Sequence, residues 1–325
     1  MTFPLTAAAL ALIACLLVGR FASVLVLKMR PAQAVILLAV ISLAVSLASG
    51  AALTAIAVAV IASLNAVAAQ QHWSAAVLRA EVPIPGWLGA LAAVAVAILL
   101  LRAVVRTVGI VVALVRADRL SEGMRAGGGP VVIVDDGSAD AFTVAGIRGC
   151  VVISLRLISA LTADERRVLT AHELSHLTRR HHLYVHIADI AAAANPLLRG
   201  VSGAVRLGVE RWADEDAATG IGDRRVTGRA LARVALLRSA LGKAAPTATR
   251  QPAVARRIPM LGVGTLQVAS RVQALLTPVP RQRTGRAATA AALSFTVLMV
   301  CLASLAHIHD AIEAAAAYLH SFAGN

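Results

Sequence analysis

The sequence predicts a mainly α-helical integral-membrane protein, with four transmembrane helices and one cytoplasmic α+β domain that contains a small β-sheet. Of its 325 residues, 58% are hydrophobic and 3% aromatic, and the mean hydropathy is +0.77. An ordinary soluble domain is about 45–50% apolar, and the excess here is concentrated in blocks of Ala, Val and Leu. A more polar stretch with short β-branched runs separates the last two blocks. These observations favour a membrane protein with one extramembrane domain.

Four apolar blocks are long enough to cross a hydrocarbon core of about 30 Å, which needs about 20 helical residues. We expect helices over residues 4–27, 32–60 and 86–106, within a segment 1–116, and over residues 287–306, within a segment 286–325. The first block lacks a basic start and an A-x-A cleavage site, so we interpret it as a retained helix. The second block predicts one span, although a break into two near Gly50 stays open.

Lys and Arg residues indicate the orientation of the spans, because cytoplasmic loops carry an excess of them. They gather after the first and third predicted spans and before the fourth: Arg20, Lys28, Arg30, Arg102, Arg106, Arg116, Arg119, Arg281, Arg283 and Arg286. The pattern places the central region in the cytoplasm and both termini outside. It also accounts for the formal net charge of +14. Nucleic-acid binding is disfavoured, because the basic stretches lack interleaved aromatic residues.

Residues 117–285 are expected to form the cytoplasmic domain. "VVIVDD", "AFTVAG" and "CVVIS" predict a sheet of two to four strands. Thr162 and Glu165 fit a capping box, which predicts a helix from there to about His182. Two more helices fit "LLRGVSGAVRLGVERWADEDAA" and "VTGRALARVALLRSAL". The stretch from Lys243 to Arg286 has eight basic residues and no acidic one, and it fits either an anionic inner leaflet or a solvated loop.

An H-E-x-x-H motif lies on the first of these predicted helices. His172 and His176 are four residues apart and share a helix face, so both imidazoles can bind one zinc ion. Glu173 follows the first histidine and is positioned to take a proton from water at the metal. The motif therefore predicts a catalytic metal site, which needs a third protein ligand and one open position.

The segment "VERWADEDA" offers that third ligand on the next predicted helix. Glu210 would complete a His2Glu site, and Asp214, one turn later, would accept the other ring N–H of a ligand histidine, with His172 the expected partner. Glu215 and Asp216 are weaker substitutes. The alternative is an exposed helix face on which these carboxylates pair with neighbouring basic residues.

Other candidate residues carry weaker signals. His181, His182 and His186 are interpreted as surface or packing residues at the basic end of the motif helix. Arg229 and Arg233 are candidates for binding a substrate carbonyl or an oxyanion. The three cysteines are far apart and indicate neither a disulfide framework nor a cysteine-based zinc site: Cys15, Cys150 and Cys301.

At these motifs the chain resembles the integral-membrane zinc peptidases of the BlaR/MecR type, which share the H-E-x-x-H and E-x-x-[AC]-D elements with HtpX-type membrane peptidases. The resemblance runs through "AFTVAGIRGCVVISLRLISAL", "LTADERRVLTAHELSHLTRRHH", "VERWADEDA" and "QPAVARRIPML". It implies a zincin-like α+β metalloprotease domain of the gluzincin type, with one Zn²⁺ per chain. By this resemblance His172, His176 and Glu210 are zinc ligands, Glu173 is the general base and Asp214 supports a ligand.

The chain departs from the antibiotic sensors of that family after the fourth span. Only about 18 residues follow His307, and the S-x-x-K motif of a penicillin-binding sensor domain is missing. We therefore expect the protease module alone, in a bacterial inner membrane. It would cleave cytoplasmic or membrane-proximal protein as a regulatory endopeptidase, for example on a transcriptional repressor or together with a separate sensor protein. The alternatives are an HtpX-like quality-control protease and a non-catalytic membrane adaptor.

Overall fold

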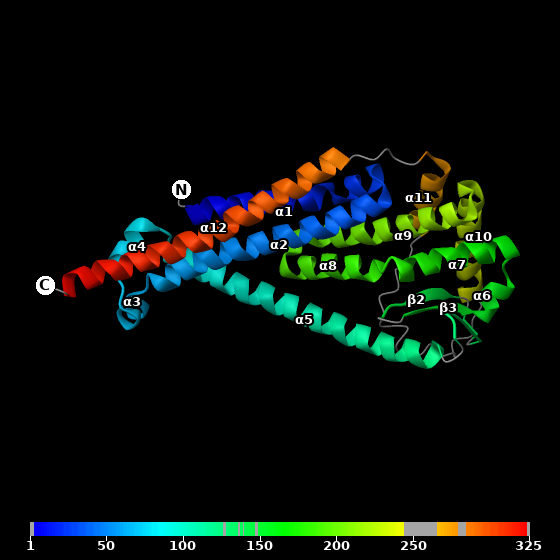
Figure 1. The fold of residues 1–325 in the computed structure, drawn as a ribbon, viewed down its shortest axis with the longest axis horizontal. Helices are drawn as coiled ribbons and strands as arrows, with labels where there is room; N and C mark the ends of the chain where they lie inside the picture. Colours follow the sequence, from blue (N-terminus) through cyan, green and yellow to red (C-terminus); the bar gives the residue numbers. More distant parts are fainter. Residues whose placement is uncertain are drawn as a thin grey trace.

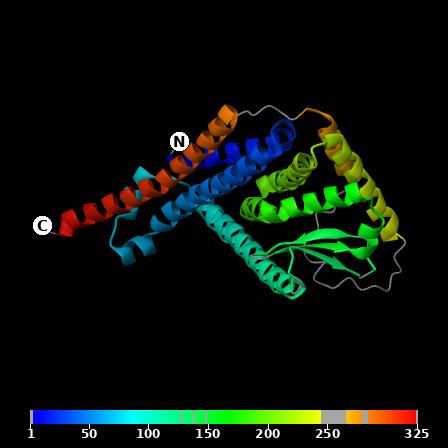
Figure 2. The same ribbon diagram turned by 45° about the vertical axis from the view of Figure 1, so that its right-hand side comes forward.

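The structure, a computed structural model, describes residues 3–125, 128–135, 137–138, 140–146, 149–243, 265–278 and 284–323. Four of its helices are long and apolar enough to cross a membrane, which identifies a multi-pass membrane protein: α1 (Phe3–Lys28), α2 (Pro31–Ala62), α5 (Gly86–Met124) and α12 (Thr284–Ala323). Three of them, α1, α2 and α12, lie side by side, while α5 diverges from this group toward the sheet (Figures 1 and 2). Each of the four predicted spans lies in a helix that is long and apolar enough to cross a membrane.

The second apolar block forms one continuous helix, because α2 passes through Gly50 without a break. This decides between the one-span and two-span alternatives in favour of one. Two short helices that the sequence analysis did not predict, α3 (Asn65–Gln71) and α4 (Ala75–Glu81), lie in the connection that follows. They lie at the end of the molecule that also holds the C-terminus (Figure 1).

Two of the spanning helices extend well beyond the stretch expected to lie in the membrane. Helix α5 has 39 residues and continues beyond the domain boundary expected at residue 117. Helix α12 has 40 residues, so the tail expected after residue 306 is helical as far as Ala323. Alanine-rich sequence favours that continuation, and Ile308, Ala311 and Ala315 pack in a cluster with Leu78 of α4.

A three-stranded sheet lies at the opposite end of the molecule (Figure 2). Strand β3 (Cys150–Ser154) is central and fully buried; it pairs in parallel with β1 (Val131–Val134) and antiparallel with β2 (Ala141–Val144). All five residues of β3 are buried because the strand is covered on both faces, which explains its continuous apolar sequence. Strand β2 has β3 on one side only, and helix α7 lies beside it.

The remaining helices follow the sheet in sequence: α6 (Leu155–Ser159), α7 (Ala163–Thr178), α8 (His181–Ala194), a 3₁₀ turn η2 (Pro196–Leu198), α9 (Arg199–Ile221), α10 (Arg224–Lys243) and α11 (Thr265–Leu276). The capping box of Thr162 and Glu165 starts α7, as predicted. However, α7 ends at Thr178, and the expected continuation to His182 is wrong. Arg180 adopts a left-handed conformation (φ 51°), which breaks the helix, so that the segment from His181 belongs to α8.

Helices α8 and α9 form a hairpin that packs among the membrane helices. Near its tip, the Asn195 amide donates to Cys15 Sγ at 2.9 Å and to Ser49 Oγ at 3.1 Å. Ser46 of α2 donates to the carbonyl of Ala191. The largest buried cluster therefore combines side chains of α1, α2, α8 and α9. The α8–α9 part of the region expected as a cytoplasmic domain therefore shares its core with the membrane bundle, whereas the sheet packs with α6, α7 and α10 in a separate cluster.

A buried carboxylate links the hairpin to α5. Asp189 of α8 accepts from Ser202 of α9, and it forms ion pairs with Arg206 of α9, at 2.6 Å, and with Arg106 of α5. Arg102 of α5 also donates to the carbonyl of Ala193 at 3.0 Å. These contacts tie α5 to the helices that carry the site described below.

Gly208 of α9 is the point of closest approach to the membrane helices. A Cβ atom there would lie 2.6 Å from Val35 Cγ2 and 2.9 Å from Val26 Cγ2. We predict that Gly208→Ala lowers the free energy of unfolding by about 1–3 kcal/mol through overpacking. Gly203→Ala on the same helix, where nothing lies within 4 Å, should instead raise it by about 0.5–1 kcal/mol, because alanine favours helix. Reversible unfolding in mild detergent measures both; equal effects would contradict the close packing of α9.

Candidate metal centre

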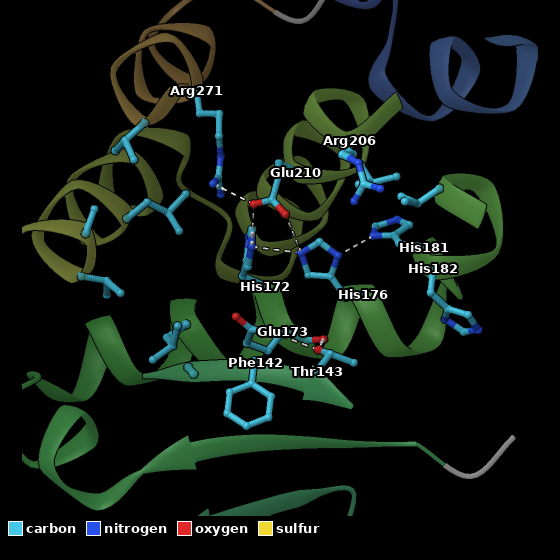
Figure 3. A pocket seen from close by; sticks show the side chains of 18 of the residues that line it. Phe142, Thr143, His172, Glu173, His176, His181, His182, Arg206, Glu210 and Arg271 are labelled. Atoms are coloured by element: carbon cyan, nitrogen blue, oxygen red, sulfur yellow. Dashed lines mark hydrogen bonds and ion pairs between the residues drawn. The ribbon is translucent and has the colours of Figure 1, made fainter. Parts of the chain in front are cut away.

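Two neighbouring helices bring three potential metal ligands together. His172 and His176 project from one face of α7, and Glu210 projects toward them from α9 (Figure 3). The two Nε2 atoms are 3.2 Å apart, and Glu210 Oε1 lies 3.5 Å from Nε2 of His176. Within the described part of the chain, this is the group of His, Cys, Asp and Glu side chains close enough to share a metal ion. Two imidazoles and one carboxylate are the donor set of a catalytic zinc site, so the residues present fit zinc.

The predicted contact between His172 and Asp214 is present. Asp214 Oδ1 lies 3.0 Å from Nδ1 of His172, which leaves Nε2 of this histidine directed toward the ligand cluster. Burial alone would lower the pKa of His172, but the neighbouring Asp214 carboxylate outweighs it and the pKa is raised. Burial also disfavours the charged form of Asp214, yet Arg271 holds the pKa of this carboxyl well below its usual range. Asp214 is therefore an anionic acceptor for the ring.

Arg271 of α11 is a buried part of the site that the sequence analysis did not identify. Its guanidinium forms two hydrogen bonds to Asp214, from Nε at 2.7 Å and from Nη2 at 2.6 Å, and its Nη1 lies 2.7 Å from Glu210 Oε2. The sequence analysis placed this arginine in a basic stretch at the membrane surface or in a solvated loop. For Arg271 that expectation is wrong, because its guanidinium is buried. The carboxylates of Asp214 and Glu210 balance its charge there.

Glu173 faces the cavity from the floor formed by α7 and β2 (Figure 3). The hydroxyl of Thr143, on β2, lies 3.0 Å from both the backbone carbonyl and Oε2 of Glu173. Burial raises the pKa of the Glu173 carboxyl, although the neighbouring His172 and Arg238 oppose the shift. A general acid–base carboxyl works best with a pKa shifted upward toward the operating pH, so the direction of this shift suits that role.

The second histidine of the motif has a histidine partner. Nδ1 of His176 lies 3.0 Å from Nδ1 of His181, the first residue of α8, and their rings are nearly perpendicular at 84°. Burial, followed by the proximity of His172, lowers the pKa of His176 well below its usual value. Burial and the neighbouring His176 lower the pKa of His181 to about 3. Both rings are therefore neutral, and His181 is a buried packing residue, which is one of the two alternatives expected from the sequence.

The cluster opens into a cavity of about 240 Å³ between β2, α7, the α8–α9 hairpin and the α10–α11 pair. Its lining is mainly apolar, with Phe142, Leu231, Val234, Val268 and Val272 among the contributing side chains. Arg206, Arg238 and Arg271 also line it. The two arginines proposed from the sequence do not, because Arg229 and Arg233 lie on the exposed side of α10. An apolar lining of this kind suits apolar groups of a bound molecule.

Residues 114–320, more than half of the chain, match the model of peptidase family M48. The chain belongs to this family. As a member of family M48 it is a metallopeptidase, and zinc is the metal typical of M48 peptidases. Neither a curated protein nor a solved structure gives a match to the chain. The family match agrees with the metallopeptidase part of the resemblance described above.

Other candidate residues from the sequence lie outside the group formed by His172, His176 and Glu210. Glu215 pairs with Arg224 at 2.6 Å, and Asp216 contacts Ser175 at 2.8 Å and Arg179 at 2.9 Å. These two carboxylates join helices and do not reach the histidines. The three cysteines are free and buried, as expected. The segment "QPAVARRIPML" lies outside the described residues.

The Arg271 contacts predict a large effect on stability in this M48 peptidase. Arg271→Gln removes the positive charge and leaves Asp214 buried without its ion pair, so we expect a loss of about 3–5 kcal/mol in the free energy of unfolding. Arg271→Lys keeps the charge but loses the paired hydrogen bonds, and should lose less. Chemical unfolding of the metal-free protein in detergent measures both. A glutamine variant as stable as the wild type would show that the ion pair is not formed.

Proposed function

We propose that the chain is a membrane-anchored zinc endopeptidase that cleaves protein close to the bilayer. The observation that carries the proposal is the convergence of His172, His176 and Glu210 beside Glu173, in a largely apolar cavity. In this proposal the first three residues hold one zinc ion per chain. Asp214 orients one of the ligands, and Arg271 keeps Asp214 ionised.

Each residue has a role that follows from its chemistry. When held by these three ligands, zinc would act as a Lewis acid that activates water and polarises a peptide carbonyl. The carboxylate of Glu173 accepts the proton of the attacking water and later delivers it to the leaving amine. Thr143 fixes the position of this carboxylate through its contact with Oε2. The apolar walls of the cavity exclude bulk water from the reacting groups.

The location of the ligands supports cleavage near the membrane. Glu210 lies two residues beyond Gly208, which packs against the end of α1 at Val26 and the beginning of α2 at Val35. The site thus lies close to the level at which these two spans are connected. We propose that this side is cytoplasmic, because the basic residues gather there, and that both termini lie outside.

Two enzymatic roles remain to be distinguished. The resemblance to BlaR/MecR-type peptidases supports a regulatory protease whose substrate is a transcriptional repressor and whose stimulus comes from a separate protein. Membership in family M48 is equally compatible with an HtpX-like role in membrane-protein quality control. A proteomic comparison of cells with active and inactive enzyme separates the two, because one predicts a single regulatory target and the other predicts many membrane proteins.

Glu173→Gln is the direct test of the proposed reaction. The amide cannot accept the proton from water, so we expect proteolysis to fall at least about 100-fold while zinc stays bound. Cleavage of a candidate membrane-protein substrate by the purified chain in detergent is the measurement. Glu165→Gln, on the same helix, is the matched control, because glutamine also fits a capping box.

Two outcomes would count against the proposal. Equal cleavage by wild type and Glu173→Gln would reject Glu173 as the base. If neither protein cleaves any substrate while both bind zinc, the non-catalytic adaptor becomes the better description of the chain.

A further inference from the structure

His181 lies against a proposed zinc ligand because of the break between α7 and α8. The left-handed Arg180 ends the turn after α7 and starts a new helix at His181. A continuous helix would carry the side chain five residues after His176 to a different face. The break instead brings the two rings to a centroid distance of 4.9 Å. The local backbone therefore serves to place one imidazole beside the other.

The contact between His176 and His181 involves Nδ1 of His176, the ring nitrogen that points away from the proposed metal ligands. Nε2 of His176 faces Nε2 of His172 and Oε1 of Glu210, at 3.2 Å and 3.5 Å. Nδ1 faces Nδ1 of His181 at 3.0 Å. One nitrogen of His176 is thus available for a metal and the other is engaged by a partner (Figure 3).

The positions of the hydrogens follow from this geometry. A nitrogen that binds a metal must offer its lone pair, so the single ring hydrogen of His176 has to be on Nδ1. The Nδ1–H of His176 then donates to Nδ1 of His181, and the hydrogen of His181 is on Nε2. The reverse arrangement, with His181 donating, would put a hydrogen on Nε2 of His176 and block metal binding.

His181 is held firmly enough to impose this choice. Its exposed fraction is 2%, and its ring packs against the indole of Trp212 with centroids 4.8 Å apart. Trp212 lies two residues after Glu210 on α9, so the same helix positions the third ligand and the partner of the second. Among the described residues, Nε2 of His181 is buried with no protein hydrogen-bond partner, and this side chain lines the cavity.

We propose that His181 is a positioning residue for zinc binding, which fixes the tautomer and ring orientation of His176 as Asp214 does for His172. This inference rests on the proposed function, because it assumes that His176 is a ligand. The two partners differ in charge: one ligand histidine donates to a carboxylate and the other to a neutral imidazole. Partners of this kind are worth about 10–100-fold in metal affinity or activity.

The test is the zinc affinity of the full chain in detergent, measured by competition with a chelator. His181→Phe keeps an aromatic ring against Trp212 but removes the acceptor, so we expect zinc to bind about 10-fold or more weakly. His181→Gln restores an acceptor oxygen and should regain part of the lost affinity. His182→Phe is the matched control, since His182 lines the same cavity without contacting a proposed ligand, and its zinc affinity should stay that of the wild type.

A purely structural role for His181 predicts that His181→Phe changes the melting temperature but leaves the zinc affinity equal to that of the wild type. The melting temperature of each metal-free variant is measured first, and His181→Met replaces His181→Phe should the latter fail to fold. Equal zinc affinity in wild type and His181→Phe would overturn the inference, as would a glutamine variant that binds zinc no better than the phenylalanine one. Absence of zinc from the wild type would instead reject the metal site itself. A shifted visible absorption spectrum of the Co²⁺-loaded His181→Phe protein, restored in His181→Gln, would support the inference.

Discussion

Two buried carboxylates, one turn apart on α9, impose the strongest constraint on this structure. Glu210 and Asp214 are 7% and 2% exposed, and removing such charges from water is costly unless opposite charges and hydrogen bonds offset the loss. Arg271 pairs with both carboxylates, and His172 contacts both as well. The histidines of α7 and the arginine of α11 are therefore held in place by the charges of α9. A divalent cation among Glu210 and the two motif histidines would complete this balance.

The same helix connects the site to the membrane. One end of α9 packs between α1 and α2, where Gly208 permits close approach, and the hairpin that it forms with α8 reaches Cys15 and Ser49 within these spans. Asp189 joins the hairpin to α5. The site is thus built partly on helices that pack within the membrane bundle, while α7 also packs with the sheet and α10 in a separate buried cluster. A displacement of α5 or of the hairpin would change the position of the metal ligands.

Most of the site could be predicted from local sequence, because the i, i+4 spacing of an α-helix fixes which side chains share a face. This accounts for His172 with His176 and for Glu210 with Asp214. Arg271 could not be predicted, because its importance depends on the packing of α11 against α9, and no local pattern reports that packing. The position of His181 beside His176 could not be predicted for a related reason. Its position depends on one left-handed residue, Arg180, and arginine carries no signal for that conformation.

The fold was predictable to a similar degree. Apolar length identified the four spans, and the β-branched runs identified the sheet, since both depend on short-range patterns. Helices α5 and α12 extend past their predicted spans, where tertiary contacts support them. The insertion of the α8–α9 hairpin among the spans was missed, because alanine-rich helices of this kind fit either a soluble core or a membrane bundle.

The central claim is that side chains from α7 and α9 hold one metal ion. Zinc K-edge X-ray absorption of the purified wild-type chain tests this most directly. The account predicts about one zinc per chain, with only nitrogen and oxygen neighbours at about 2.0–2.2 Å and the scattering pattern of two imidazole rings. Sulfur neighbours at about 2.3 Å, or no bound zinc at all, would contradict it.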